Sequence, residues 1–188
     1  MSNSQSPWQS LTTRSYLLCA ALGAVQAMTI IALSPVTAAA ASISPPVYGL
    51  VSALMILFIN LSVRLIHSPI AALLTAALTS IIAVPFSSLG FLIAVPLLLQ
   101  GAAIGATLWI TRGRGEWNYL LAGGVAGVVG FFVALPVFSQ DDLVPTVLAL
   151  TFAARVVAGV ASALLAGILA RALSAAGVGP RAPRPREE

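Results

Sequence analysis

The chain has 188 residues, of which 59% are hydrophobic and 7% are charged, and its formal net charge is +4. Soluble domains carry about 25% charged residues, so this composition excludes an ordinary soluble domain and indicates a membrane protein with several spans. It also leaves no room for a separate soluble catalytic domain.

A membrane span needs roughly 20 predominantly apolar residues, and the sequence offers six such stretches. In chain order they cover about 15–34, 46–66, 69–85, 90–111, 118–138 and 144–174. We therefore expect an all-α integral membrane protein, a six-helix bundle over residues 14–175. Residues 1–13 are polar and residues 176–188 are rich in proline and arginine, so we expect two disordered tails.

Residues 35–46 are small and uncharged, and we expect a loop there. Pro45 and Pro46 at its end suit the start of the next helix. An alternative for the first stretch is a cleaved signal peptide, because Arg14 precedes it and Ala38–Ala40 follow it. The apolar run is longer than the about 7–15 residues usual in such peptides, which argues against that alternative.

All nine basic residues are arginines, and all except Arg155 lie in the tails, the 64–68 turn, the 112–117 loop or the end of the last stretch. The other three loops carry no arginine, and one of them holds Asp141 and Asp142. Because cytoplasmic loops are enriched in basic residues, we expect a protein of the cell membrane with both termini in the cytoplasm. We interpret these arginines as contacts to anionic lipid surfaces and not to nucleic acid.

Small residues recur four positions apart along several stretches, which places them on one face of a helix. Such faces either dock another membrane subunit or pack inside the protein, and the sequence leaves both alternatives open. Pro96 and Pro136 lie within or near spans, where we expect them to bend helices. The small pairs are Ala20/Ala24, Gly101/Gly105, Gly123/Gly127 and Gly159/Ala163/Gly167.

No set of residues in the sequence has the composition of a catalytic or metal site. His67 is the single histidine and lies at a turn, where we expect a cap or a headgroup contact, and Cys19 is the single cysteine. A metal site needs several such ligands, and no nucleotide-binding fingerprint occurs. We therefore expect no enzyme activity, no metal and no cofactor.

Arg155 lies within the last apolar stretch, where a charge is costly and marks a candidate functional site. It contacts a ligand in one interpretation, and in the other it is a structural arginine satisfied inside the bundle. Gln26, Asn60 and Gln100 are the other strongly polar side chains at membrane depth. Phe131, Phe132, Phe138 and Phe152 lie near the outer halves of the fifth and sixth stretches and could stack a heterocycle.

Three segments resemble the substrate-binding S component of energy-coupling factor (ECF) vitamin transporters, in the YkoE-like branch linked to thiamine and hydroxymethylpyrimidine. They are RLIHSPIAALLTAAL (64–78), LLLQGAAIGATLW (97–109) and GILARALSAAGV (167–178). The resemblance implies a six-helix S component that takes a vitamin-like ligand from outside, and a T subunit with two ATP-binding subunits as partners. It implies docking on that T subunit through Ala20 and Ala24.

The resemblance also implies a ligand site made by the first outer loop and the fourth to sixth helices. On that basis the candidate ligand contacts are Gln100, Arg155, Phe132, Phe152, Tyr48 and Asp142. The branch tends to place a glutamate where Gly105 stands, and Thr75, Ala76 and Thr79 occupy a helix where another carboxylate is expected. A cationic thiamine ring favours an acidic partner, so a neutral pyrimidine fits this sequence better.

The leading hypothesis is therefore a solute-binding membrane subunit. The alternative is a scaffold or assembly subunit of the membrane that binds no ligand. A third hypothesis, an intramembrane enzyme acting on lipids, requires acidic metal-binding motifs that the sequence lacks.

Overall fold

The computed structural model describes residues 11–87, 90–112, 115–137 and 144–178, and these residues form helices and no strand. The expected disordered tails lie mostly outside them, as do Phe138, Asp141 and Asp142. The longer helices are α1 (Thr13–Ile43), α2 (Pro45–Val51), α3 (Leu57–Ile66), α4 (Ile70–Ala83), α5 (Ala94–Ile110), α6 (Glu116–Ala134) and α7 (Pro145–Ala175). Short 3-10 turns are η1 (Ser52–Ile56), η2 (Val84–Phe86), η3 (Gly90–Ile93) and η4 (Leu135–Val137).

The chain is a multi-pass membrane protein. Within the described residues, five helical segments are long and apolar enough to span a bilayer: Thr13–Ala40, Pro45–Ile66, Gly90–Ile110, Glu116–Ala134 and Pro145–Ala175. The remaining apolar segment, Ile70–Phe86, is shorter. Large apolar side chains such as Leu17, Met28, Ile110 and Val157 lie exposed on the outside, as expected where helices face lipid tails.

The loop expected at residues 35–46 is wrong over most of its length, because α1 continues to Ile43. Pro35 lies inside this helix and cannot donate a hydrogen bond to the carbonyl of Ile31. The helix nevertheless continues, and the residues after Pro35 include four alanines at 38–41, the best helix formers. Pro45 then begins α2 as expected, at the first position of the helix.

Pro96 and Pro136, for which bends were expected, lie near the junctions of α5 and α6 with short 3-10 turns. Pro96 lies in the first turn of α5, where its missing N–H group has no intrahelical acceptor to lose. Pro136 lies in η4, directly after the end of α6 at Ala134.

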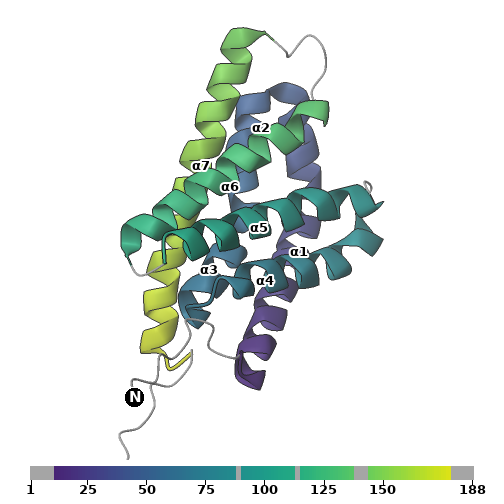
Figure 1. Ribbon diagram of the computed structural model, residues 1–188. Coiled ribbons are helices and arrows are strands. Elements are labelled where there is room, and N and C mark those ends of the chain that lie inside the picture. The colour runs from purple at the N-terminus through teal and green to yellow at the C-terminus, as the bar shows by residue number, and fades with distance from the viewer. Residues whose placement is uncertain (1–10, 88–89, 113–114, 138–143, 179–188) are drawn as a thin grey trace, which may run out of the picture.

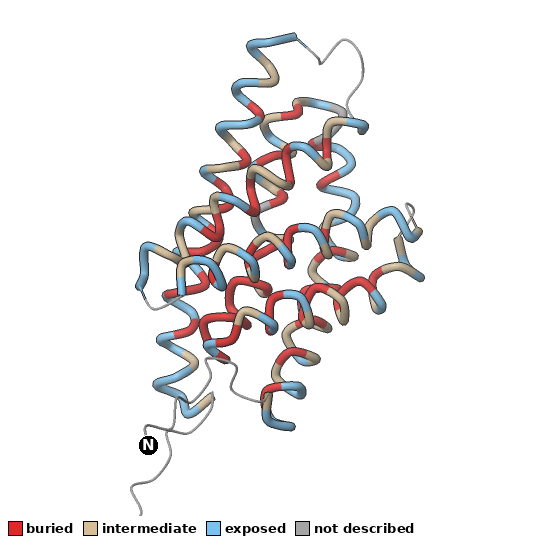
Figure 2. The backbone as a smooth tube through the Cα atoms, in the orientation of Figure 1, coloured by how far each residue is buried: buried red, intermediate tan, exposed pale blue. Residues whose placement is uncertain are grey.

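The helices form one bundle in which α1 and α7 are the longest elements, at 31 residues each. In Figure 1, α6 lies diagonally across α7, while α4 and α5 cross α1. Buried residues gather where α3 to α7 meet, in the middle of the molecule (Figure 2). This core includes Ile59, Ile104 and Ala126, which are fully buried.

The glycine pairs serve internal packing. A Cβ atom on Gly123 would lie 2.5 Å from the backbone oxygen of Gly159, and a Cβ on Gly159 would lie 2.2 Å from that of Gly123. Likewise, a Cβ on Gly101 would lie 2.6 Å from the Cβ of Ala76. The backbones of α6 and α7, and those of α4 and α5, approach so closely that only glycine fits at these crossings.

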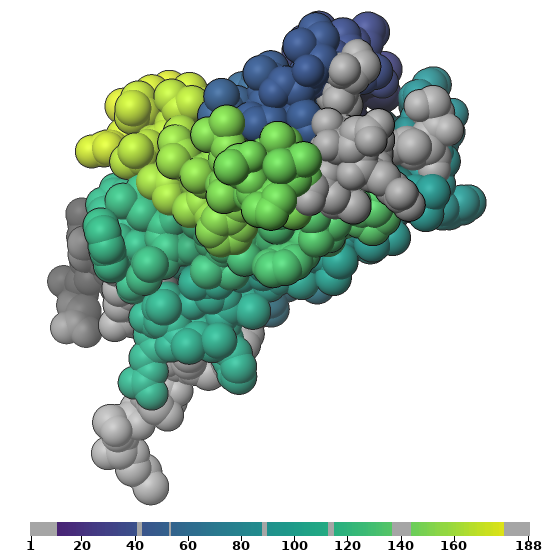
Figure 3. All heavy atoms as spheres, turned by 90° about the horizontal axis from the view of Figure 1, so that it is seen from above, coloured from purple at the N-terminus to yellow at the C-terminus, as the bar shows by residue number. Residues whose placement is uncertain are grey.

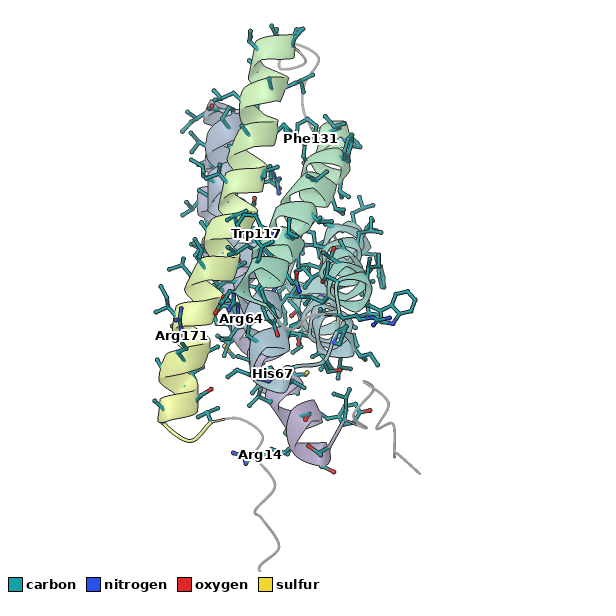
Figure 4. All side chains as sticks on the ribbon, turned by 60° about the vertical axis from the view of Figure 1, so that its left-hand side comes forward. Arg14, Arg64, His67, Trp117, Phe131 and Arg171 are labelled. Carbon is teal, nitrogen blue, oxygen red and sulfur yellow. The ribbon has the colours of Figure 1, made fainter. Side chains whose placement is uncertain are left out.

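Both ends of the described chain lie at the same end of the bundle. The guanidinium of Arg14, at the start of α1, donates a hydrogen bond of 3.3 Å to the carbonyl of Gly177, after α7. Figure 4 shows Arg14, His67 and Arg171 at that end and Phe131 toward the other.

Candidate functional site

Arg155 lies on the buried face of α7, and only 6% of it is exposed. This face follows the helical period of three and four residues, with small residues on either side of the arginine. The start of α7 lies ~15 Å away along the helix axis and Arg171 lies ~24 Å away, at about 1.5 Å per residue. Arg155 therefore lies nearer the end opposite the chain termini. The buried residues of α7 are Thr151, Arg155, Ala158, Gly159, Ser162, Ala163, Ala166, Gly167 and Ala170.

Tyr48 of α2 is the first partner of Arg155. The guanidinium carbon lies 4.9 Å from the centroid of the Tyr48 ring, which is the geometry of a cation–π contact. Figure 3 shows α2, in blue, beside the start of α7, in green. The helix that begins at Pro45 therefore brings an aromatic face to the buried charge.

Gln100 of α5 and Gly130 of α6 complete the group that we call the Arg155 site: Tyr48, Gln100, Gly130 and Arg155. A Cβ atom on Gly130 would lie 2.6 Å from Nε2 of Gln100 and 3.2 Å from Nη1 of Arg155. Both polar ends thus lie over the bare backbone of Gly130. The sequence analysis singled out Gln100, Arg155 and Tyr48, and the structure brings them together from three helices.

The charge of Arg155 has no counter-charge among the residues described. Among the described residues, the ion pair joins Arg64 to Glu116. No described carboxylate lies within salt-bridge distance of Arg155. Its Nε atom is buried without a hydrogen-bond partner. Burying an unpaired donor is costly, so this group is either satisfied by an added molecule or retained at the expense of stability.

Three phenylalanines adjoin the site on α6 and α7. Phe131 is buried, with its ring edge-on to Phe132 at 5.5 Å and to Phe152 at 5.3 Å between centroids. Phe132 itself is 60% exposed, so the buried aromatic contact is made by Phe131, beside Gly130. The candidate contact Asp142 lies outside the described residues.

A second buried arginine was not identified as such from the sequence. Arg64 of α3 was expected to mark a segment end, but its side chain is 7% exposed and Nη1 lies 2.7 Å from Oε2 of Glu116. The guanidinium also lies 4.5 Å from the ring centroid of Tyr119 and 2.7 Å from where a Cβ on Gly167 would lie. Arg64, Glu116, Tyr119 and Gly167 thus connect α3, α6 and α7 near the end that holds the chain termini.

The other polar residues at membrane depth have structural partners. Asn60 donates to Oγ of Ser162 at 3.2 Å, and Gln26 donates to the carbonyl of Met55, although its own Oε1 is buried without a partner. His67 caps α3 in the left-handed conformation, with its N–H group 2.8 Å from the carbonyl of Val63. The cap expected for His67 is confirmed.

Ala20 and Ala24 are half-buried on α1. Gly23 lies between them in sequence and packs closely on α4, with its Cβ position 3.3 Å from the carbonyl of Thr75. Leu17, Val25 and Met28 on the same helix are exposed. The two alanines therefore border an exposed apolar part of α1 and are not themselves in its buried contact.

No family model matches this sequence, and no curated protein matches it. Among solved structures, one described as "Crystal structure of an S-component of ECF transporter" superposes with a TM-score of 0.83. It is 20% identical and covers 90% of this chain and 88% of its own. The chain has the S-component fold. The all-α membrane fold expected from the sequence is confirmed, and the count of six spans stays a prediction. Within this S-component fold the Arg155 site joins α2, α5, α6 and α7.

Proposed function

We propose that this chain is the substrate-binding subunit of an ECF-type importer, a transport protein and not an enzyme. It captures a vitamin or vitamin precursor outside the cell and passes it on through a T subunit with two ATP-binding subunits. The observation that carries the proposal is the meeting of Arg155, Tyr48 and Gln100 inside an S-component fold. A buried charge without a counter-charge, set among aromatic and amide groups, is a strong candidate for a ligand contact in a membrane protein.

The orientation follows from the distribution of arginine. Arg14, Arg64 and Arg171 lie in the half of the bundle that holds the chain ends (Figure 4), and we assign that end to the cytoplasm of the cell. The Arg155 site then lies in the outer half of the membrane, on the side from which an importer takes its substrate. We also propose Asp142, which precedes α7 in the sequence, as a candidate ligand contact.

The sequence resemblance points to thiamine or hydroxymethylpyrimidine as the kind of ligand. Phe132 and Phe152 flank the buried ring of Phe131 at the same end of α6 and α7. Aromatic rings at that place could receive the ring of such a heterocycle.

Docking on the T subunit is proposed for the exposed part of α1 that Ala20 and Ala24 border. Small side chains at this spacing allow another helix to approach closely. The glycine pairs are engaged inside the bundle, which leaves Ala20 and Ala24 as the available small pair. The same observation weakens the scaffold alternative, which relied on several small-residue faces being free for partners.

The proposal is tested by thermal unfolding of the full chain in nanodiscs with thiamine, hydroxymethylpyrimidine, riboflavin and biotin. One compound should raise the Tm in a concentration-dependent way, because a ligand that binds only the folded state stabilises it. Arg155→Met and Gln100→Ala should abolish the shift. Arg171→Met, on the same helix but at the other end, should retain it, and the absence of any shift would favour the scaffold.

A further inference from the structure

We infer that the Arg155 site selects an uncharged or anionic ligand that presents a hydrogen-bond acceptor, and that it rejects a positively charged one. This inference rests on the proposed function and concerns the charge of the molecule bound. It separates hydroxymethylpyrimidine from thiamine, because the two share a pyrimidine ring and thiamine adds a cationic thiazolium.

The hydrogen-bonding groups of the site are chiefly donors. A guanidinium carries five N–H donors and no acceptor, and the Nε of Arg155 is buried without a partner. The amide of Gln100 reaches the same space over Gly130. A ring nitrogen, a carbonyl or a carboxylate on the ligand would supply the acceptor that the described residues do not supply to this Nε.

The charge of the site is positive. Glu116 is the one carboxylate among the residues that the structure describes, and it pairs with Arg64 on the cytoplasmic side of the bundle. A cationic ligand would meet the guanidinium of Arg155 as its nearest described charge, in surroundings where repulsion is weakly screened. An anionic or neutral ligand meets no like charge among the described residues of the site.

The comparison with Arg64 shows what a structural arginine looks like in this chain. Arg64 is buried to a similar degree, and its Nε and Nη2 also lack a hydrogen-bond partner, but its Nη1 has a carboxylate at 2.7 Å. Arg155 has an aromatic face and no carboxylate. An uncompensated buried charge destabilises a fold, and even a buried ion pair can often be replaced by apolar residues of similar volume without loss of stability, so a charge kept only for stability is expected to be paired.

The experiment has a ligand arm in which binding constants are measured by calorimetry on the full chain in nanodiscs. The probes form pairs that share a ring but differ in charge: hydroxymethylpyrimidine against thiamine, and nicotinate against 1-methylnicotinamide, with biotin as a further carboxylate. We expect the tightest binder to be neutral or anionic, and we expect Arg155→Met to weaken it at least tenfold while Arg171→Met does not. A cation as the tightest binder would overturn the inference and leave the proposed function standing. Binding by none of the probes would count against both.

A second arm needs no ligand and compares the Tm of three proteins. We expect Arg155→Met to melt at or above the wild-type temperature, and we expect Glu116→Ala, which removes the counter-charge of Arg64, to melt below it. If Arg155→Met melts as low as Glu116→Ala, or fails to fold, Arg155 is a structural residue and the inference is overturned. In that case the Tm of Arg155→Lys, which keeps the charge, shows whether the charge or the shape of the arginine side chain stabilises the protein.

Discussion

Arg64 of α3 and Glu116 of α6 form an ion pair of 2.7 Å whose two members differ sharply in exposure, at 7% and 63% of their side chains. Removing Glu116 leaves the buried guanidinium of Arg64 without a counter-charge. Removing Arg64 leaves only a carboxylate that is already largely exposed to its surroundings. The cost of breaking the pair should therefore depend on which partner is removed.

We predict that Glu116→Ala lowers the free energy of unfolding by about 2 kcal/mol, because a buried guanidinium loses its charged partner. Arg64→Met should cost less, under about 1 kcal/mol, since pairs with an exposed partner contribute little. Chemical unfolding of both variants in the same detergent measures the difference. An equal or reversed order would show that packing of Arg64 over Gly167, not charge, dominates.

The crossing of α6 and α7 provides a second prediction, for which Gly123 and Gly124 form a matched pair. A Cβ at Gly123 meets the Gly159 backbone at 2.5 Å, while a Cβ at Gly124 lies at an ordinary 3.6 Å from Val160 Cγ2. Gly123→Ala should destabilise by about 2–3 kcal/mol or prevent folding, because backbone cannot move aside cheaply. Gly124→Ala should be neutral or stabilise by about 0.5–1 kcal/mol through helix propensity. The melting temperatures of the two variants test this prediction. Similar values for Gly123→Ala and Gly124→Ala would mean that the backbones of α6 and α7 are not in such close contact.

A substitution at Gly130 is predicted to change ligand binding and to leave the stability of the fold nearly unchanged. Its added Cβ would meet only the ends of two flexible side chains, Gln100 Nε2 at 2.6 Å and Arg155 Nη1 at 3.2 Å. We expect Gly130→Ala to change the free energy of unfolding by less than about 1 kcal/mol, since these ends can move. It should weaken ligand binding at least tenfold by displacing both groups, a loss of about 1.4 kcal/mol or more in binding free energy. Calorimetry with Gly124→Ala as the control provides the measurement, and unchanged affinity in Gly130→Ala would place the ligand elsewhere.

The α1 surface is tested by changing small residues to large ones. Ala20→Leu and Ala24→Leu should leave the melting temperature of the isolated chain nearly unchanged, because both side chains are only half-buried. They should reduce co-purification with the T subunit and ATP-binding subunits, because close helix approach is blocked. Ala21→Leu, one position away and exposed, is the control that should retain the complex. Full co-purification of the Ala20 and Ala24 variants would move the docking surface off this part of α1.

The sequence predicted the class of fold because composition and apolar length alone exclude the alternatives. The predictions from the sequence were wrong where one local signal for a loop competes with another for a helix. Pro35 indicated a loop, yet the helix continued through the alanines that follow it. Pro96, where a bend was expected, lies in the first turn of α5, a position that tolerates proline.

The candidate site was partly predictable for a similar reason. Arg155 stands out as a charge in an apolar helix, and the resemblance singled out Gln100. The pairing of Arg64 with Glu116 could not be read from the sequence, because the two residues are far apart along the chain and both lie near segment ends, where charges are ordinary. The role of Gly130 depends on how α5, α6 and α7 cross, which no local pattern specifies.

The most direct measurement is to purify the wild-type chain and Arg155→Met from cells grown in rich medium, extract each protein, and identify the retained small molecules by mass spectrometry. The account predicts one neutral or anionic compound in near-stoichiometric amount with the wild type and absent from the variant. Identical extracts from the two proteins, with the variant folded, would contradict the claim that Arg155 is part of a substrate-binding site.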